Sequence, residues 1–298
     1  KGRDGSVKKF VLIYNPVSGK AAFMSRLDSI LEAFQQRDCM LIIYRTKKDN
    51  SGLADFIREA APDGLLAAGG DGTLHEVVNI LMREKIQLPV AILPSGTSND
   101  FATYLGVDEN LEAYFDHIAA GRTRRVDLGL VDSEYFVNVA SAGMVTSIAH
   151  EVDVRLKNVM GKLAYYLRGL STLPQFHPLE LSIQADGDQV FDGKAFLFVI
   201  VNSGVVGSFK NAAVAAKVDD GKLDMLIVKY CSMPEVVALT AEILSGRDIS
   251  HQKNILYLQA SSFEVSAAED IESDLDGELG PKLPLTVQTV SRAIEMYY

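Results

Sequence analysis

The sequence contains few cysteines and no apolar run long enough to cross a membrane. Its two cysteines, Cys39 and Cys231, lie far apart and neither belongs to a CxxC pair. A disulfide scaffold and a zinc ribbon are therefore excluded. A spanning helix needs roughly 20 consecutive apolar residues, and the N-terminal residues lack the apolar core of a signal peptide. We expect a cytoplasmic protein whose contact with a membrane is transient and peripheral.

Positive charge is scarce in the second half of the chain. The 298 residues include 29 Lys and Arg against 39 Asp and Glu, which gives a formal net charge of −10. Residues 1–125 carry 16 charged side chains of each sign, so the whole excess lies in residues 126–298. A negative charge of this size has the wrong sign for a protein that binds nucleic acid. Its uneven distribution indicates two domains with different functions.

The first 125 residues alternate buried strands with helices. Four unbroken apolar runs predict strands, at residues 10–14, 40–44, 64–68 and 90–93. Apolar residues at helical spacing predict helices between them, at about 23–34, 53–57 and 73–84. This alternation is typical of a parallel sheet covered by helices on both faces. We expect residues 1–125 to form a doubly wound α/β domain.

The remaining residues have the pattern of an antiparallel β structure. Apolar and polar residues alternate along 126–140, as in a strand with one exposed face. Strand-like segments follow at 179–185, 189–191, 195–201, 223–230 and 255–265, and helical stretches at about 147–171 and 234–245. We expect residues 126–298 to form a mainly antiparallel β domain. The end of the chain, from about residue 287, is expected to pack back on the first domain.

A glycine-rich turn joins the third predicted strand to a helix. It reads Gly69-Gly70-Asp71-Gly72-Thr73-Leu74-His75-Glu76. Glycine allows close approach of the backbone, and a helix N-terminus favours an anion such as phosphate. Asp71 repels phosphate but can hold Mg²⁺ or position a hydroxyl group. The dinucleotide fingerprint GxGxxG is excluded because His75 stands where glycine is required, and no Walker A motif is present. A turn that only joins strand to helix stays open as an alternative.

Two other predicted strands end in similar segments. Pro94-Ser95-Gly96-Thr97-Ser98-Asn99-Asp100-Phe101 follows the fourth strand, and Asn15-Pro16-Val17-Ser18-Gly19-Lys20 follows the first. Both bring small polar residues to the carboxyl end of a parallel strand, where ligands bind in doubly wound sheets. Three such ends at one edge of a sheet favour a ligand site, and Lys20 can pair with a phosphate group.

These segments resemble the nucleotide site of the diacylglycerol kinase catalytic domain, a family that includes sphingosine, ceramide and soluble bacterial lipid kinases. The resemblance continues through Val126-Asp127-Leu128-Gly129, Lys217-Val218-Asp219-Asp220-Gly221 and Leu275-Asp276-Gly277-Glu278, and so spans nearly the whole chain. The Gly-Gly-Asp-Gly-Thr turn alone is shared with NAD kinases and phosphofructokinases, whereas the other segments are typical of lipid kinases. The resemblance implies an α/β domain and a β-rich domain, with the active site in the cleft between them.

The resemblance also implies roles for individual residues. Glu278 is expected to be the base that deprotonates a lipid hydroxyl group, and Asp71, Asp100 and Asp127 are expected to organise Mg²⁺ and its water. A structural Mg²⁺ is expected at Asp220 with backbone carbonyls near Lys217 and Lys222. His75 departs from the family, in which many members have Asn. The residues expected to bind ATP are Asn15, Lys20, Thr46, Gly70, Asp71, Gly72, Thr73, Leu74, His75, Glu76 and Thr97.

We therefore expect a lipid kinase that uses ATP and Mg²⁺ to phosphorylate the hydroxyl group of diacylglycerol, giving phosphatidic acid. The alternatives are another acceptor (phosphatidylglycerol, a sphingoid lipid or NAD) and a regulatory protein that binds nucleotide or lipid without turnover. The expected partners are ATP and a membrane lipid, reached by peripheral contact with the bilayer; a homodimer stays open. Two uses are open for the amphipathic segment 145–173: lying on a membrane surface or packing over the β domain.

Overall fold

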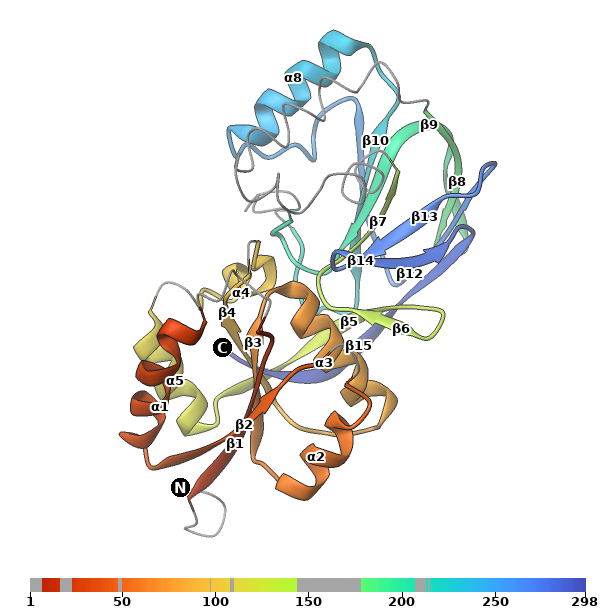
Figure 1. The fold of residues 1–298 in the computed structure, drawn as a ribbon. Coiled ribbons are helices and arrows are strands. Elements are labelled where there is room, and N and C mark those ends of the chain that lie inside the picture. Colours follow the sequence, from red (N-terminus) through yellow and green to blue (C-terminus); the bar gives the residue numbers. More distant parts are fainter. Residues whose placement is uncertain are drawn as a thin grey trace.

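The computed structural model describes residues 7–16, 23–47, 50–96, 98–107, 110–143, 178–206, 213 and 215–298. Lys20, Thr97, the helical stretch predicted at about 147–171 and the amphipathic segment 145–173 around it lie outside the described residues. The described chain forms two lobes, and its strands form one sheet that continues through both of them (Figure 1). No helix of the described part is long and apolar enough to cross a bilayer.

The N-terminal lobe is a parallel sheet with helices on both faces (Figure 1). Its strands lie in the order β4–β3–β1–β2, with β1 at Lys8–Tyr14, β2 at Cys39–Arg45, β3 at Gly64–Gly69 and β4 at Val90–Pro94. One face carries α1 (Leu27–Gln35) and α5 (Leu111–Ala120), and the other carries α2 (Leu53–Ala60) and α3 (Asp71–Arg83). A 3-10 helix, η2 (Met24–Arg26), precedes α1, and a short helix, α4 (Asp100–Tyr104), follows β4. The predicted α/β domain is confirmed.

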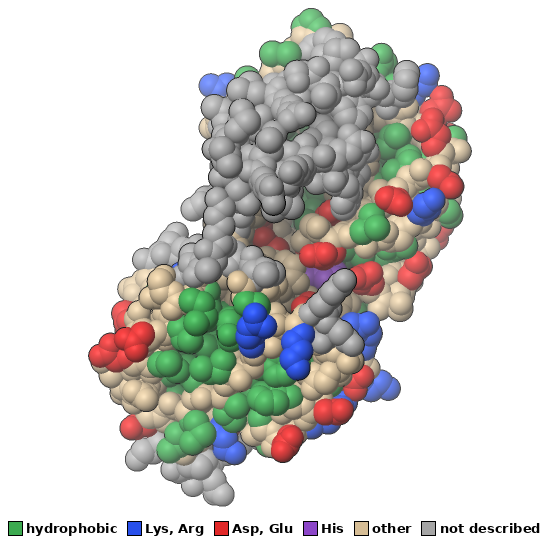
Figure 2. Space-filling view, viewed as in Figure 1, with side chains coloured by type: hydrophobic (Ala, Val, Ile, Leu, Met, Phe, Trp, Pro, Cys, Tyr) green, Lys and Arg blue, Asp and Glu red, His purple; other side chains and the backbone are tan. Residues whose placement is uncertain are grey.

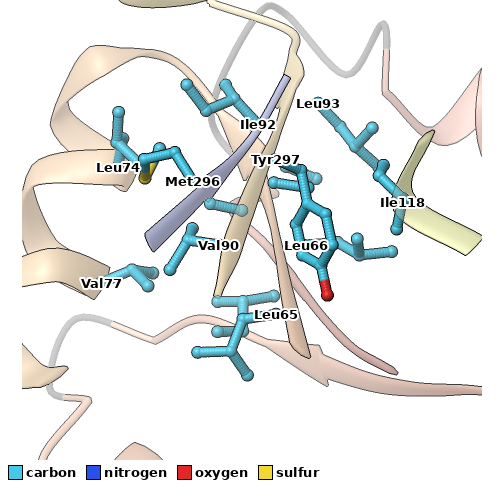
Figure 3. Packing of buried hydrophobic residues seen from close by; sticks show 14 of the residues in the cluster. Leu65, Leu66, Leu74, Val77, Val90, Ile92, Leu93, Ile118, Met296 and Tyr297 are labelled. Atoms are coloured by element: carbon cyan, nitrogen blue, oxygen red, sulfur yellow. The ribbon is translucent and has the colours of Figure 1, made fainter. Parts of the chain in front are cut away.

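Three of the four apolar runs, those of β1, β3 and β4, are strands buried on both faces, whereas Met40 and Ile43 of β2 are exposed. Leu65, Val90 and Ile92 of β3 and β4 pack with Leu74 and Val77 of α3 in one cluster (Figure 3). Full burial of a side chain of this size stabilises the fold by about 1.5–3 kcal/mol. Because helices shield both faces of the sheet, no polar residue alternates with the apolar ones along these strands.

In its described residues, the C-terminal lobe is mainly antiparallel sheet with one helix, α8 (Met233–Leu244), at its far end (Figure 1). All strand pairs are antiparallel here, and the predicted β domain is confirmed. Its strands, of which β5 begins and β15 ends in the α/β lobe, are β5 (Thr123–Val131), β6 (Glu134–Phe136), β7 (Val139–Gly143), β8 (Leu179–Ala185), β9 (Asp188–Val201), β10 (Leu223–Lys229), β11 (Ile255–Ala260), β12 (Ser262–Ala267), β13 (Glu272–Leu275), β14 (Glu278–Lys282) and β15 (Leu285–Tyr297).

Two segments predicted as single strands are interrupted. The chain turns at Asp132, whose φ of 54° is left-handed, so residues 126–140 belong to three strands, β5, β6 and β7. Residues 255–265 divide at Ser261, because β11 pairs with β10 whereas β12 pairs with β8 and β15. Conversely, the predicted strands at 189–191 and 195–201 are one strand, β9. Helix α5 was not predicted.

Strands β5 and β15 run side by side from one lobe to the other. Val126 of β5 and Met296 of β15 belong to the hydrophobic core of the α/β lobe, while Val131 and Val287 belong to that of the β lobe. Met296 also pairs in parallel with Val90 of β4. The end of the chain thus completes the first lobe and ties it to the second.

Candidate active site

The two glycine turns that follow β3 and β4 touch through their backbones. Gly70 precedes α3 in an extended conformation and offers no side chain to its N-terminus. A Cβ atom on Gly96 would lie 2.5 Å from the Cα of Gly70, so only glycine fits there without a shift. The N–H of Ser95 donates to the carbonyl of Gly69 at 2.9 Å. The two strand ends therefore form one backbone surface beside the N–H groups of the first turn of α3.

Asp71 lies in a cluster of carboxylates. Its oxygens accept hydrogen bonds from the N–H groups of Asp100 (3.3 Å) and Phe101 (3.5 Å), at the start of α4. Burial, followed by the nearby charges of Asp100 and Asp276, raises the pKa of Asp71 to about 6. No group of three His, Cys, Asp or Glu side chains in the described part forms a metal site. A cation would nevertheless relieve the repulsion within this cluster.

A hairpin of the second lobe brings Glu278 to the first turn of α3. Asp276 and Gly277 form the two-residue loop between β13 and β14, with φ values of 54° and 94°. Such a pair is typical of a type I′ turn. Glu278 follows at once, and its side chain lies so close to Gly72 that a Cβ atom there would be 2.7 Å from Oε1. The expected base and the glycine turn are thus in contact.

Asp276 is held from both lobes. Its carboxylate accepts the N–H groups of Val137 (2.7 Å), Asn138 (2.8 Å) and Val139 (2.9 Å). It also lies 3.1 Å from Nδ1 of His75, a residue of α3. Acidic side chains and a histidine gather where the two lobes meet (Figure 2).

His75 contacts a second carboxylate, because its Nε2 is 3.1 Å from Oε1 of Glu134. Burial lowers the pKa of His75, but hydrogen bonds and charges of Asp276 and Glu134 raise it by more, and the net pKa lies above its ordinary value. Both ring nitrogens therefore face second-lobe carboxylates. The expected contact of His75 with ATP stays a prediction.

Asp127 is fully buried between β15 and the segment 217–222. Its two carboxylate oxygens accept the N–H groups of Gly221 and Arg292, each at 2.6 Å. Its own N–H donates to the carbonyl of Val218 at 2.6 Å. These contacts connect β5, β15 and the predicted structural Mg²⁺ site. The expected role of Asp127 toward Mg²⁺ stays a prediction.

The predicted structural Mg²⁺ site is an exposed turn. Asp220 and Lys222 are exposed, and Oδ1 of Asp220 accepts the N–H of Lys222 at 3.0 Å. Carboxylate and carbonyl oxygens are suitable ligands for Mg²⁺, and the bonds of Asp127 hold the turn in place.

The remaining expected ATP residues surround the first turns of α3. The N–H of Asn15 donates to the carbonyl of Ala68 (3.2 Å), and that of Thr46 to the carbonyl of Tyr14 (2.9 Å). Glu76 accepts a hydrogen bond of 2.6 Å from Nδ2 of Asn50. Thr73 and Leu74 are buried in the helix. The ends of β1, β2 and β3 therefore meet at this edge of the sheet.

Several residues of the site were not predicted from the sequence. Glu134 contacts His75, and Asn50 donates a hydrogen bond to Glu76. The buried Oγ of Ser95 has no hydrogen-bond partner among the described residues. Asp276 belongs to the late Asp-Gly-Glu motif, which drew attention to Glu278. The Asp-Gly pair signals the turn but not the contact with His75.

The first lobe is a parallel α/β domain with glycine turns at its strand ends. The second is a β domain that brings a carboxylate to these turns. Together they have the architecture of a two-domain kinase. Residues 9–131 match the diacylglycerol kinase catalytic domain, and residues 138–298 match the YegS C-terminal NAD kinase beta sandwich-like domain. The chain belongs to the diacylglycerol kinase family, and it is a lipid kinase.

Its relatives match over nearly their whole length. Diacylglycerol kinase of Bacillus subtilis (strain 168) is 34% identical over 286 residues, 93% of this chain and 92% of the relative. That of Staphylococcus saprophyticus is 34% identical over 97% of this chain and 95% of its own length. A crystal structure of a Bacillus anthracis diacylglycerol kinase has a TM-score of 0.79 at 26% identity, with 98% of this chain and 97% of that chain covered. An NAD kinase from Archaeoglobus fulgidus in complex with ATP shares the fold, at a TM-score of 0.54 and 12% identity over 97% of this chain and 93% of that chain.

Proposed function

We propose that this lipid kinase transfers the γ-phosphate of ATP to the free hydroxyl group of diacylglycerol and gives phosphatidic acid. The observation that carries the proposal is the closeness of the Glu278 carboxylate to Gly72 in the first turn of α3. The carboxylate that we propose as the base lies beside the backbone N–H groups that favour a phosphate. Relatives called diacylglycerol kinase, similar over 93% and 97% of this chain, support the choice of acceptor.

The chemistry needs a base and a means of neutralising charge. Glu278 takes the proton of the lipid hydroxyl group as its oxygen attacks the γ-phosphorus of ATP. The bond from that phosphorus to the oxygen bridging it to the β-phosphate breaks, and ADP leaves. A positioned base contributes about 10²–10⁴-fold to the rate. The rest of the rate enhancement comes from positioning and charge stabilisation.

The phosphates of ATP are proposed to lie against the backbone of Gly70 and Gly72, with Asn15 and Thr46 at the neighbouring strand ends. Lys20 and Thr97 complete the proposed nucleotide site, outside the described residues. Because the acceptor is a bilayer lipid, peripheral contact with a membrane follows from the proposal.

Mg²⁺ is proposed to bind with ATP at Asp71 and Asp100. When bound, Mg²⁺ neutralises charge on the phosphate oxygens. The residues fit a cation, since burial and neighbouring carboxylates raise the pKa of Asp71. A second Mg²⁺ is proposed at the carboxylate of Asp220 and the carbonyls of Lys217 and Lys222, where it has a structural role.

The test is transfer of label from γ-labelled ATP, with Mg²⁺, to diacylglycerol, phosphatidylglycerol, sphingosine, ceramide and NAD. Diacylglycerol should be labelled, and Glu278→Gln should lower turnover by roughly 10²–10⁴-fold while ATP still binds. Glu264→Gln, which changes an exposed carboxylate of β12, is the matched control and should keep full turnover.

Other outcomes contradict defined parts of the proposal. Full activity of the Glu278→Gln enzyme would remove the assigned base. Label on another lipid would change the acceptor, and label on NAD alone would move the enzyme to soluble acceptors. ATP binding without any labelled product would favour the regulatory alternative.

A further inference from the structure

His75 joins two elements of the β lobe to α3. Nδ1 is 3.1 Å from Oδ2 of Asp276, and Nε2 is 3.1 Å from Oε1 of Glu134. The side chain of His75 is only 7% exposed and that of Asp276 only 1%. Glu134 is 41% exposed, so it is the one partner that solvent reaches.

The hydrogen-bond partners of His75 favour protons on both ring nitrogens. Asp276 already accepts three backbone N–H groups and accepts the ring as well, so Nδ1 must donate. A neutral ring would then direct the lone pair of Nε2 at an oxygen of Glu134, which is a repulsive contact. The imidazolium form instead donates to both carboxylates, and such charge-assisted hydrogen bonds are the stronger kind.

The helix meets the hairpin of Glu278 at two points. Gly72 and His75 are three residues apart in α3 and therefore lie on the same face. Gly72 faces the side chain of Glu278, and His75 binds Asp276, the first residue of the hairpin loop. Strand β6 has a further link to α3, because Asn79 exchanges hydrogen bonds with the backbone of Tyr135 at 2.7 and 2.9 Å.

We propose that His75 is a positioning residue: as an imidazolium ion between Asp276 and Glu134, it holds the β13–β14 hairpin, and with it Glu278, against the first turn of α3. The inference rests on the proposed role of Glu278 as the base. The charged groups that face the ring are Asp276 of the hairpin and Glu134 of β6. Asp71, on the same helix, adds a further carboxylate near Asp276.

The proposal makes turnover depend on pH. The two carboxylates raise the pKa of His75 above its ordinary value, despite its burial. The bridge is intact below this raised pKa and is lost as the pH rises through it. The pH profile of kcat should therefore have an alkaline limb that belongs to His75.

Three variants test this assignment. His75→Ala should lower kcat by roughly 100-fold, the effect of moving a catalytic group by about 1 Å. His75→Asn should restore most of the turnover, because Nδ2 of Asn occupies the place of Nδ1 and donates to Asp276, but without the alkaline limb. Glu134→Gln keeps an acceptor for Nε2 and removes a charge, so the limb should move to lower pH.

Proton NMR titration supplies a readout that needs no lipid acceptor. The chain has five histidines, and the resonance missing from His75→Asn identifies His75. It should titrate above about 6.5 in the wild type and at lower pH in Glu134→Gln. The proposal would be overturned if His75 titrated at or below the ordinary histidine pKa, or if its titration did not shift in Glu134→Gln. Full kcat of the His75→Ala enzyme would overturn it as well. An active Glu278→Gln enzyme would instead contradict the proposed function and leave the titration of His75 as measured.

Discussion

Oε1 of Glu278 lies only 2.7 Å from the position that a Cβ atom on Gly72 would occupy. The closeness joins a hairpin of the β lobe to a helix of the α/β lobe. It exists because α3 has no side chain in its first turn at this point. The glycine therefore leaves room for the carboxylate of Glu278.

Gly72→Ala should separate activity from stability. The new methyl group displaces the carboxylate of Glu278, whose flexible side chain rotates away, and we expect kcat to fall by roughly 100-fold. Alanine is the better helix former, by up to about 1 kcal/mol, so Tm should stay the same or rise. Kinetic assays and thermal unfolding check both points.

The matched control for this variant is Gly52→Ala. Gly52 precedes α2 with a φ of −84°, and no atom lies within 4 Å of a Cβ atom there. Its kcat should equal that of the wild type. Equal kcat values for the Gly72 and Gly52 variants would show that Glu278 does not need its observed place.

Gly96→Ala should damage the fold and nucleotide binding together. The Cβ atom would lie 2.5 Å from the Cα of Gly70, and backbone cannot rotate away as a side chain does. We expect a loss of about 1–3 kcal/mol in the free energy of unfolding, as for other overpacked sites. Urea unfolding and ATP titration are the measurements, and unchanged values in both would mean that the two turns separate easily.

The sequence predicted the parts of the fold that depend on local pattern. Strands buried on both faces, such as β1 and β3, appear as unbroken apolar runs, and these predictions were confirmed. The break at Asp132 was missed because the alternating pattern continues across it. A left-handed φ at a non-glycine residue leaves little trace in composition. The split at Ser261 depends on which strands lie beside it, and this is a tertiary property.

Only the parts of the candidate site that belong to short sequence motifs were predicted. The turn at Gly70 and the residue Glu278 were named, because each belongs to a short segment with a recognisable order of residues. The partners of His75 were missed, since Glu134 and Asp276 come from different hairpins that only the folded sheet brings to α3.

Asp127→Asn should unfold more readily than the wild type. Both carboxylate oxygens accept backbone N–H groups at 2.6 Å, and the side chain is fully buried. The amide of Asn has an NH₂ group, a donor, in place of one carboxylate oxygen. The N–H of either Gly221 or Arg292 therefore loses its acceptor. Such a group costs about 1–3 kcal/mol. Thermal unfolding with and without Mg²⁺ is the measurement. An unchanged Tm together with weaker Mg²⁺ binding would support the role expected from the sequence.

Asp71→Asn should raise stability at pH 8 while turnover is lost. Burial, then Asp100 and Asp276, raise the pKa of Asp71 from 3.8 to about 6 in the folded protein. The unfolded chain therefore ionises first, and the folded state loses stability as the pH rises from about 4 to about 6. The loss amounts to roughly 3 kcal/mol and persists at higher pH. Asn does not titrate and avoids this loss, although it forfeits one acceptor oxygen, worth about 1 kcal/mol.

The pH dependence identifies the cause. The stability gained by Asp71→Asn should grow between pH 4 and pH 6 and then stay constant. Asp186→Asn is a control of opposite sign, because hydrogen bonds from Ser261, chiefly that of its hydroxyl group, lower the pKa of Asp186 despite some desolvation. Asp186 stabilises the fold above its unfolded pKa, so its Asn variant should be the less stable one at pH 8 and approach the wild type in acid. Urea unfolding of the three proteins from pH 4 to pH 8 measures both trends. If Asp71→Asn lost stability at pH 8 as Asp186→Asn does, the carboxylate of Asp71 would be stabilised by its surroundings, and the cluster would have no excess negative charge for a cation to neutralise.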